Sequence, residues 1–263
     1  MRRAGSVLVT SLWTWALGPE PSYHLLMTTP VLALPDFEDL LLQAERAHGH
    51  LCAGQILGVR MALLALHRLG ISDPRPRTLP DGTLNPDRKR LVTFVEIDRC
   101  ATDAIGVVTA CRLGKRALKF RDWGKMAATF VDLNSPITPS LLSSFAADGG
   151  PAFSFDVTTP TYKAIRIAAL ESSKARAREL YPQIEDKNQQ QMRAYRELPD
   201  SDLFSEQWVA VPIHPRELPG YKSPRITCAQ CGEGINYDRE STLQNQTLCQ
   251  SCAHPESRYY QPL

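Results

Sequence analysis

The chain has 263 residues, of which 43% are hydrophobic and 22% are charged. This is an ordinary soluble-protein composition, sufficient for one good core and a small additional unit. The formal net charge of +2 excludes an overall basic field of the kind that attracts nucleic acid.

The first 26 residues have the outline of a signal peptide without its essential parts. Arg2 and Arg3 precede a mostly apolar run over 4–18, but no small-residue cleavage site follows. The run is also too short to span a membrane. Met27 offers an alternative start, so we expect residues 1–35 to be a disordered or misassigned extension rather than an export signal.

Two helices are expected next. Apolar residues recur at helical spacing over 37–47, and Asp36 is placed as an N-cap. A second helical run covers 56–69 and stops at Gly70, as helices commonly end in glycine. Between them, the segment 48–54 carries two glycines that let the backbone turn or pass close to a partner.

The rest of the core is expected to mix strands and helices. The expected segments are a loop over 71–90, a buried strand over 91–97, a helix over 101–113, strands over 117–121 and 127–133, an irregular stretch over 134–152 and a long helix over 161–196 with a break at Pro182. The last assignment follows from its many charges, which suggest a solvated helix. The predicted fold is α+β, with a mixed helix and antiparallel-sheet core over 36–205, a linker over 206–225 and a ribbon over 226–256.

Two segments of the core carry potential metal ligands. His48, His50 and Cys52 supply nitrogen and sulfur within five residues. Cys100 sits where a strand gives way to a helix, where exposed N–H groups lower the pKa of a thiol and favour a ligand or nucleophile. Asp103 lies one turn further and could ligate a metal, orient a water or complement the helix dipole.

The bland alternatives are a capped turn with a buried thiol over 48–52 and a small core residue at Cys100. Cys111 would lie ~16 Å from Cys100 along an unbroken helix, so we expect it outside any shared site. Lys115 is either a solvated charge or a contact for an anionic ligand.

The C-terminal region holds two CxxC pairs, Cys228 with Cys231 and Cys249 with Cys252, separated by seventeen residues. This spacing is typical of the four-thiolate zinc ribbon. Four thiolates close a tetrahedral shell and leave no position for a substrate, so we predict a structural zinc. Two disulfides or a redox pair are the alternatives. A thiolate zinc site favours a reducing, cytoplasmic location.

Several motifs together resemble the E-subunit family of formylmethanofuran dehydrogenase. The matching segments are the HGHLCAG sequence over 48–54, the EIDRCATDAI sequence over 96–105, TACRLGK over 109–115, FRDWGK over 120–125, and the stretch over 193–204. Together they run from about residue 37 to residue 252. The family usually has proline after the first motif cysteine, where this chain has Ala53, and GKxN where this chain has GKRA.

The resemblance implies an α+β core, commonly dimeric, with an attached zinc ribbon. It also implies a core metal site built from His48, His50, Cys52, Cys100 and Asp103, to which we assign a second divalent metal, with zinc as the leading candidate. The family name reflects linkage to a molybdenum or tungsten enzyme that makes formylmethanofuran. Nothing in this chain resembles the pterin-binding catalytic subunits.

Three functions are compatible with these observations. The favoured one is a metal-binding accessory protein, a homodimer with no membrane association, that docks an oxidoreductase subunit in molybdenum- or tungsten-dependent one-carbon chemistry. The second is a stand-alone zinc-dependent enzyme with Cys100 and Asp103 as catalytic residues. The third, nucleic-acid binding by the ribbon, is disfavoured because its basic and acidic residues nearly balance. Whether the protein is an enzyme stays open.

Overall fold

The structure is a computed structural model that describes residues 34–138 and 159–261. The expected extension over 1–35 therefore lies almost wholly outside the described residues, as does most of the stretch expected to be irregular over 134–152. The first four residues of that stretch belong to a strand.

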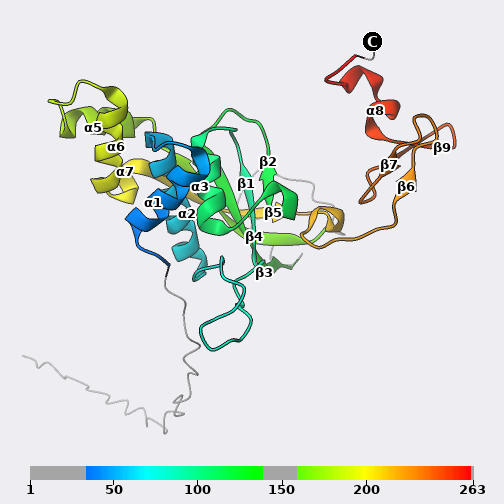
Figure 1. Cartoon of the computed structure of the whole chain (residues 1–263), viewed down its shortest axis with the longest axis horizontal. Coiled ribbons are helices and arrows are strands. Elements are labelled where there is room, and N and C mark those ends of the chain that lie inside the picture. The colour runs from blue at the N-terminus through cyan, green and yellow to red at the C-terminus, as the bar shows by residue number, and fades with distance from the viewer. Residues whose placement is uncertain (1–33, 139–158, 262–263) are drawn as a thin grey trace, which may run out of the picture. The chain divides into compact units, whose positions relative to one another are not determined.

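Two helices open the described chain (Figure 1). Helix α1 (Phe37–His48) begins at Asp36, whose carboxylate accepts a hydrogen bond from the Asp39 N–H at 2.9 Å, as an N-cap does. Helix α2 (Ala53–Leu69) ends at Gly70, whose φ of 60° lies in the left-handed region that suits glycine. Both helices are confirmed, although α2 begins three residues earlier than its apolar pattern indicated.

A five-stranded sheet forms the centre of the core, in the order β2-β1-β3-β4-β5. Its strands are β1 (Leu91–Val95), β2 (Leu118–Phe120), β3 (Ala127–Ile137), β4 (Thr161–Ala169) and β5 (Phe204–Pro212). All neighbouring pairs are antiparallel except β1 with β2, which is parallel. The sheet is therefore mixed but mostly antiparallel, and the α+β class is confirmed.

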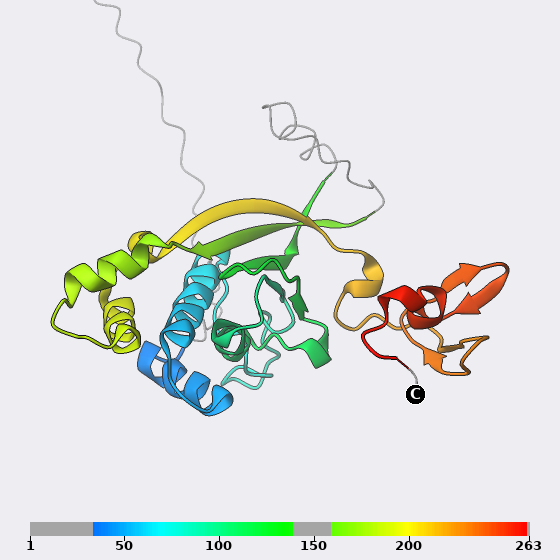
Figure 2. The ribbon, with the colours of Figure 1, turned by 90° about the horizontal axis from the view of Figure 1, so that it is seen from above.

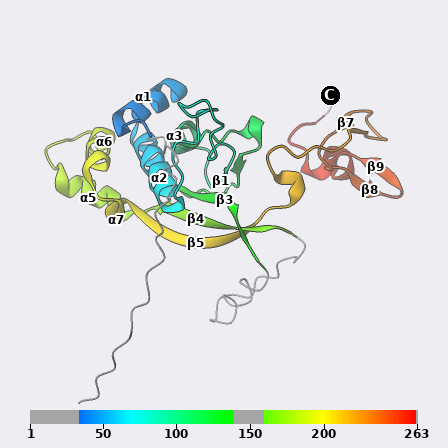
Figure 3. The same ribbon diagram turned by 90° about the horizontal axis from the view of Figure 1, so that it is seen from below.

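The main hydrophobic core lies between one face of this sheet and the helices. Helices α1, α2 and α3 (Cys100–Thr109) gather on the same side of the sheet in the two rotated views (Figures 2 and 3). Ile56 and Met61 of α2 are fully buried there, with Phe130, Ile165 and Ile167 from the sheet. Alternate strand residues such as Val92 and Val131 face the other side and pack with Ile213.

The helix expected over 161–196 is wrong in its first third. Residues 161–169 form strand β4, which pairs with β3 on one side and β5 on the other. Helices α5 (Ser172–Leu180) and α6 (Lys187–Glu197) follow, and Pro182 lies in the break between them, as predicted. Strand β4 has apolar residues on both faces, Ala164 toward one and Ile165 toward the other, so simple alternation is blurred.

The sheet also extends beyond the expected end of the core. After the short helix α7 (Asp200–Leu203), β5 pairs with β4 from Phe204 to Pro212. Residues 206–212, expected within a linker, are thus part of the sheet. The helix expected over 101–113 ends at Thr109, because Ala110 adopts a left-handed φ of 57° and Leu113–Lys115 form a separate 3-10 turn, η1.

The C-terminal elements are short. They are the hairpin of β6 (Ile226–Thr227) and β7 (Gly234–Ile235), the hairpin of β8 (Ser241–Leu243) and β9 (Gln246–Leu248), and helix α8 (Gln250–Ala253). Two further 3-10 turns are η2 (Pro215–Glu217) and η3 (Pro255–Ser257). None of the helices in the described residues has the length and apolar character needed to cross a bilayer.

Candidate metal centres

The connection between α1 and α2 brings its ligands together by a turn rather than by a continuous helix. Gly49 has a φ of 101°, and its N–H donates to the Glu45 carbonyl, which ends α1 directly after His48. The backbone then extends through Cys52, which is the N-cap residue of α2 with a φ of −145°. The pairing of His48 and Cys52 on one face of an unbroken helix does not occur. The glycine-marked turn does.

Helix α3 meets α2 at this turn because glycines let the two backbones approach. A Cβ on Gly58 would lie 2.6 Å from the Ala101 carbonyl oxygen, and one on Gly54 would lie 3.3 Å from the Cys100 Cβ. Only glycine permits such a close crossing without displacement. The crossing sets Cys100, the first residue of α3, beside Cys52, the residue that precedes α2.

These elements create a group of three potential ligands from two distant segments. One ligand atom from each of His48, Cys52 and Cys100 lies within 4.8 Å of the others, and all three residues are partly buried. Imidazole nitrogen and thiolate sulfur are the donors that zinc prefers, and three protein ligands of this type match an open rather than a closed site. The donor set therefore fits a divalent metal.

Two other predicted residues lie beside the group without belonging to it. The imidazole ring of His50 is exposed, with its centroid 4.8 Å from that of His48. Asp103 places its Oδ2 2.8 Å from His48 Nδ1. A carboxylate on one ring nitrogen fixes the orientation of an imidazole and leaves the other nitrogen for a metal. The sequence indicated Asp103 but not this contact, because 55 residues separate it from His48.

The pKa of the Cys100 thiol differs in direction from the expectation. Burial raises it, and the neighbouring Cys52 thiol raises it further, against smaller lowering effects from the backbone N–H groups and Arg99. The helix N-terminus acts as predicted but is outweighed. Two thiolates side by side are unfavourable without a cation between them, so this pair is suited to sharing one.

Cys111 lies outside this group, as predicted. Its side chain is 2% exposed, and its sulfur lies 3.5 Å from Thr93 Oγ1 within the core. Burial raises the pKa of this thiol. It is a packed core residue.

The four C-terminal cysteines form the second group of potential ligands. Their sulfurs all lie within 4.8 Å of one another. Cys228 and Cys231 occupy the turn of the β6–β7 hairpin, where Gly232 has a φ of 75° and its N–H donates to the Cys228 carbonyl at 3.0 Å. Cys249 precedes α8 and Cys252 lies within it. The ribbon is confirmed as a four-cysteine cluster.

The electrostatics of this cluster favour a bound cation. Backbone N–H groups of Cys231 and Cys249 lower the pKa of Cys228 to about 6. Burial and the other three sulfurs raise the pKa of Cys252 to about 12. Four sulfurs at this separation cannot all ionise unless a positive ion offsets their repulsion. The donor set fits a structural metal with four thiolate ligands.

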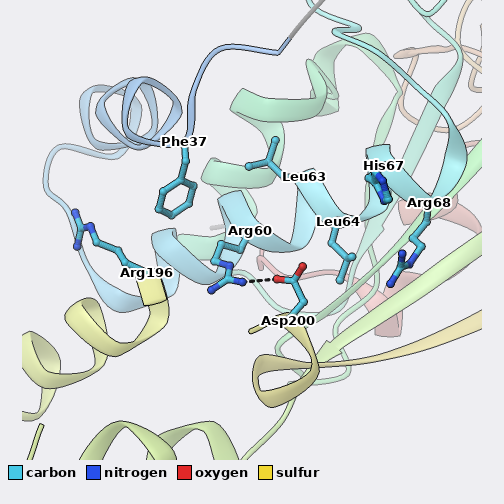
Figure 4. Close-up of a pocket in the computed structure, with 8 residues that line it drawn as sticks. All are labelled: Phe37, Arg60, Leu63, Leu64, His67, Arg68, Arg196 and Asp200. Carbon is cyan, nitrogen blue, oxygen red and sulfur yellow. Dashed lines mark hydrogen bonds and ion pairs between the residues drawn. The ribbon is translucent and has the colours of Figure 1, made fainter. Parts of the chain in front are cut away.

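A hollow of about 530 Å³ lies elsewhere, between α1, α2 and the end of α6. It contains none of the predicted site residues. Its guanidinium groups are already paired: Arg60 with Asp200 at 2.5 Å, as drawn in Figure 4, Arg68 with Glu206 and Arg196 with Glu38. These pairs tie helices α1, α6 and α7 and strand β5 together, and they give this hollow a structural role.

The fold and the two clusters define a class: an α+β protein with a His/Cys group in its core and a four-cysteine ribbon, both able to hold a metal ion. Residues 47–205 match the family model described as "FmdE, Molybdenum formylmethanofuran dehydrogenase operon". The chain belongs to this family.

Two individual proteins are also similar. An FmdE-like protein of tungsten formylmethanofuran dehydrogenase type from Syntrophus aciditrophicus, of known crystal structure, has 18% identity and a TM-score of 0.48, over 84% of this chain and 94% of that one. A "Probable S-adenosyl-L-methionine-binding protein" of Archaeoglobus fulgidus is 37% identical over 92 residues. That match covers 35% of this chain and only 23% of the relative's length.

Proposed function

We propose that the protein is a metal-binding accessory protein whose core centre holds a divalent metal, with zinc as the leading candidate. It would act with an oxidoreductase of molybdenum- or tungsten-dependent one-carbon chemistry. The observation that carries the proposal is the convergence of His48, Cys52 and Cys100, whose ligand atoms lie within 4.8 Å. Membership of a family described by a formylmethanofuran dehydrogenase operon supports the choice of partner.

In this proposal His48, Cys52 and Cys100 are the metal ligands, and Asp103 orients the imidazole. A bound divalent metal would supply a Lewis acid and stabilise two adjacent thiolates. The 2.8 Å contact between Asp103 and His48 supports the orienting role. His50 is exposed beside the group and would take a ligand role only after its side chain rotates inward.

The four ribbon cysteines, Cys228, Cys231, Cys249 and Cys252, would hold a structural zinc. The ribbon over 226–256 would then fold as a unit distinct from the core over 36–205 and serve as a docking element for the partner protein. The opposed pKa shifts within the cluster support a metal over two free thiol pairs, because a cation removes the repulsion that raises the pKa of Cys252.

A stand-alone zinc-dependent enzyme is the second candidate. Three protein ligands leave one position for water or substrate, which is the arrangement of catalytic zinc sites. Cys100 or Asp103 would then handle the proton. The partly buried but accessible character of the three ligands supports this alternative. Turnover of a substrate by the isolated protein, lost in Asp103→Asn, would favour it over the accessory role.

Metal analysis of purified protein tests the proposal. The wild type is expected to carry about two zinc ions per chain. Cys52→Ser should lose the core metal and keep a folded core and ribbon. Cys231→Ser should lose the other metal and unfold the ribbon, because the binding energy of a structural zinc is largely folding energy. Cys111→Ala is the matched control, since this thiol lies in neither cluster.

Equal metal content in wild type and Cys52→Ser would refute the core centre and leave the ribbon site untouched. A tagged protein purified from its native cells should retain an oxidoreductase subunit. Light scattering should give a mass of twice 29.3 kDa if the protein is a homodimer. Consistent recovery of a lone chain without any such partner would contradict the accessory role.

A further inference from the structure

A second hollow, of about 540 Å³, lies between α1, the end of α3 and the loop that follows α2. Its lining includes four cationic side chains, Arg46, Arg75, Arg112 and Lys115, and no carboxylate. We refer to it as the basic hollow. Its volume is within the range of small-molecule binding sites, and its cations come from three separate segments of the chain.

Three of these four cations are uncompensated. Arg75 is held by Asp73, with Nε to Oδ1 at 2.7 Å, and donates to Gln43. Arg46, Arg112 and Lys115 form no ion pair with any residue that the structure describes. The hollow of Figure 4 has a similar volume, but each of its three arginines has a carboxylate partner.

Helix termini account for only part of this charge. Ala110, the C-cap residue of α3, lines the basic hollow, and a helix C-terminus carries roughly half a negative charge. With Asp73 included, about one and a half negative charges face four cations. The excess is about two and a half positive charges in one concave site. A helix cap does not require such an excess, whereas an anion does.

We propose that the basic hollow binds a small anionic ligand through a phosphate or carboxylate group. The planar guanidinium fork of arginine matches both groups with two parallel hydrogen bonds, and Lys115 adds a mobile point charge. Arg46 lies on α1 and Arg112 directly follows α3, so one anion between them would also link the two helices that carry His48 and Cys100.

The basic hollow lies along the same helix pair as the core metal ligands. Ala47 in its lining immediately precedes His48, and Val107 follows Asp103 by one helical turn, or about 6 Å along the axis. This step rests on the proposed metal centre. If both sites are occupied, the substrate class is an acidic small molecule with its anionic group in the basic hollow and its reacting end toward the metal.

Calorimetric titration of the full chain with inorganic phosphate and, separately, succinate tests the proposal at constant ionic strength. The variant is Arg112→Gln with Lys115→Gln. The matched control is Arg178→Gln with Lys187→Gln, two exposed cations on α5 and α6 that remove the same charge far along the chain. The wild type should bind at least one probe, and the variant should bind it about tenfold more weakly.

The control should stay within about twofold of the wild type. A response to phosphate alone assigns a phosphorylated ligand, and a response to succinate alone assigns a carboxylate ligand. No binding of either probe below about 20 mM, or an equal loss in the control, would overturn the proposal. Cys52→Ser should still bind the probe, so failure of the metal centre and failure of the anion site give different results.

Discussion

The close crossing of α2 and α3 gives the sharpest prediction, Gly58→Ala. A Cβ at this position would lie 2.6 Å from the Ala101 carbonyl oxygen and 2.8 Å from its Cα. The first contact is about 0.8 Å short of an ordinary 3.4 Å contact. Both atoms belong to the backbone, so no side-chain rotation relieves the clash, and α3 must move away from α2.

The expected cost follows from two opposing effects. Overpacking of this kind costs about 1–3 kcal/mol, and alanine in place of glycine within a helix returns about 1 kcal/mol. We therefore expect a net loss of about 1–2 kcal/mol in the free energy of unfolding. The same movement draws Cys100 away from Cys52, so the metal content of the core should fall more than the modest loss of stability alone would cause.

The assay combines urea unfolding with metal analysis of the folded protein. The matched control is Gly114→Ala, since a Cβ there meets no atom within 4 Å and its φ is not positive. That variant should change the free energy of unfolding by less than about 0.5 kcal/mol and keep its metal. If Gly58→Ala unfolds at the same urea concentration as the control and retains its core metal, the argument from the helix crossing is wrong.

Three further outcomes are expected. Asp103→Asn should weaken metal binding at the core centre by about 10–100-fold and leave the ribbon metal in place, as measured by chelator competition. Arg166→Ala should cost about 3–5 kcal/mol in urea unfolding, because it strands the Glu96 carboxylate, which is 2% exposed and holds Arg166 at 2.6 and 2.7 Å. Burial opposes ionisation of Asp132, but hydrogen bonds from Arg90 and its neighbours lower its pKa overall. Its stabilising contribution is therefore complete above the unfolded pKa of about 4 and is lost as pH falls below it, so Asp132→Asn should flatten the acid side of the stability profile.

Local sequence patterns predicted much of the architecture. The N-cap at Asp36, the glycine stop at Gly70 and the β-rich run that became β1 each depend on neighbouring residues only. The two CxxC pairs also report their own chemistry, since each presents two sulfurs from a single turn. The four-cysteine cluster was therefore accessible from spacing alone.

The error at 161–169 shows where local pattern fails. Strand β4 lies between β3 and β5, so both of its faces are covered and apolar residues occur on each. Its charged residue Arg166 is held by Glu96, a partner seventy residues away. A sequence with charges and apolar residues on both faces resembles a solvated helix until its neighbouring strands are known.

By itself the sequence determined which side chains could bind metal, where the helices begin and end, and that four C-terminal thiols cluster. Only the tertiary structure decided that His48, Cys52 and Cys100 converge while His50 stays outside, and that Arg46 meets Arg112 and Lys115 around one hollow. The reason is that helix spacing and turns are set by adjacent residues. The approach of α1, α2 and α3 depends instead on how glycines and core side chains far apart in the chain pack together.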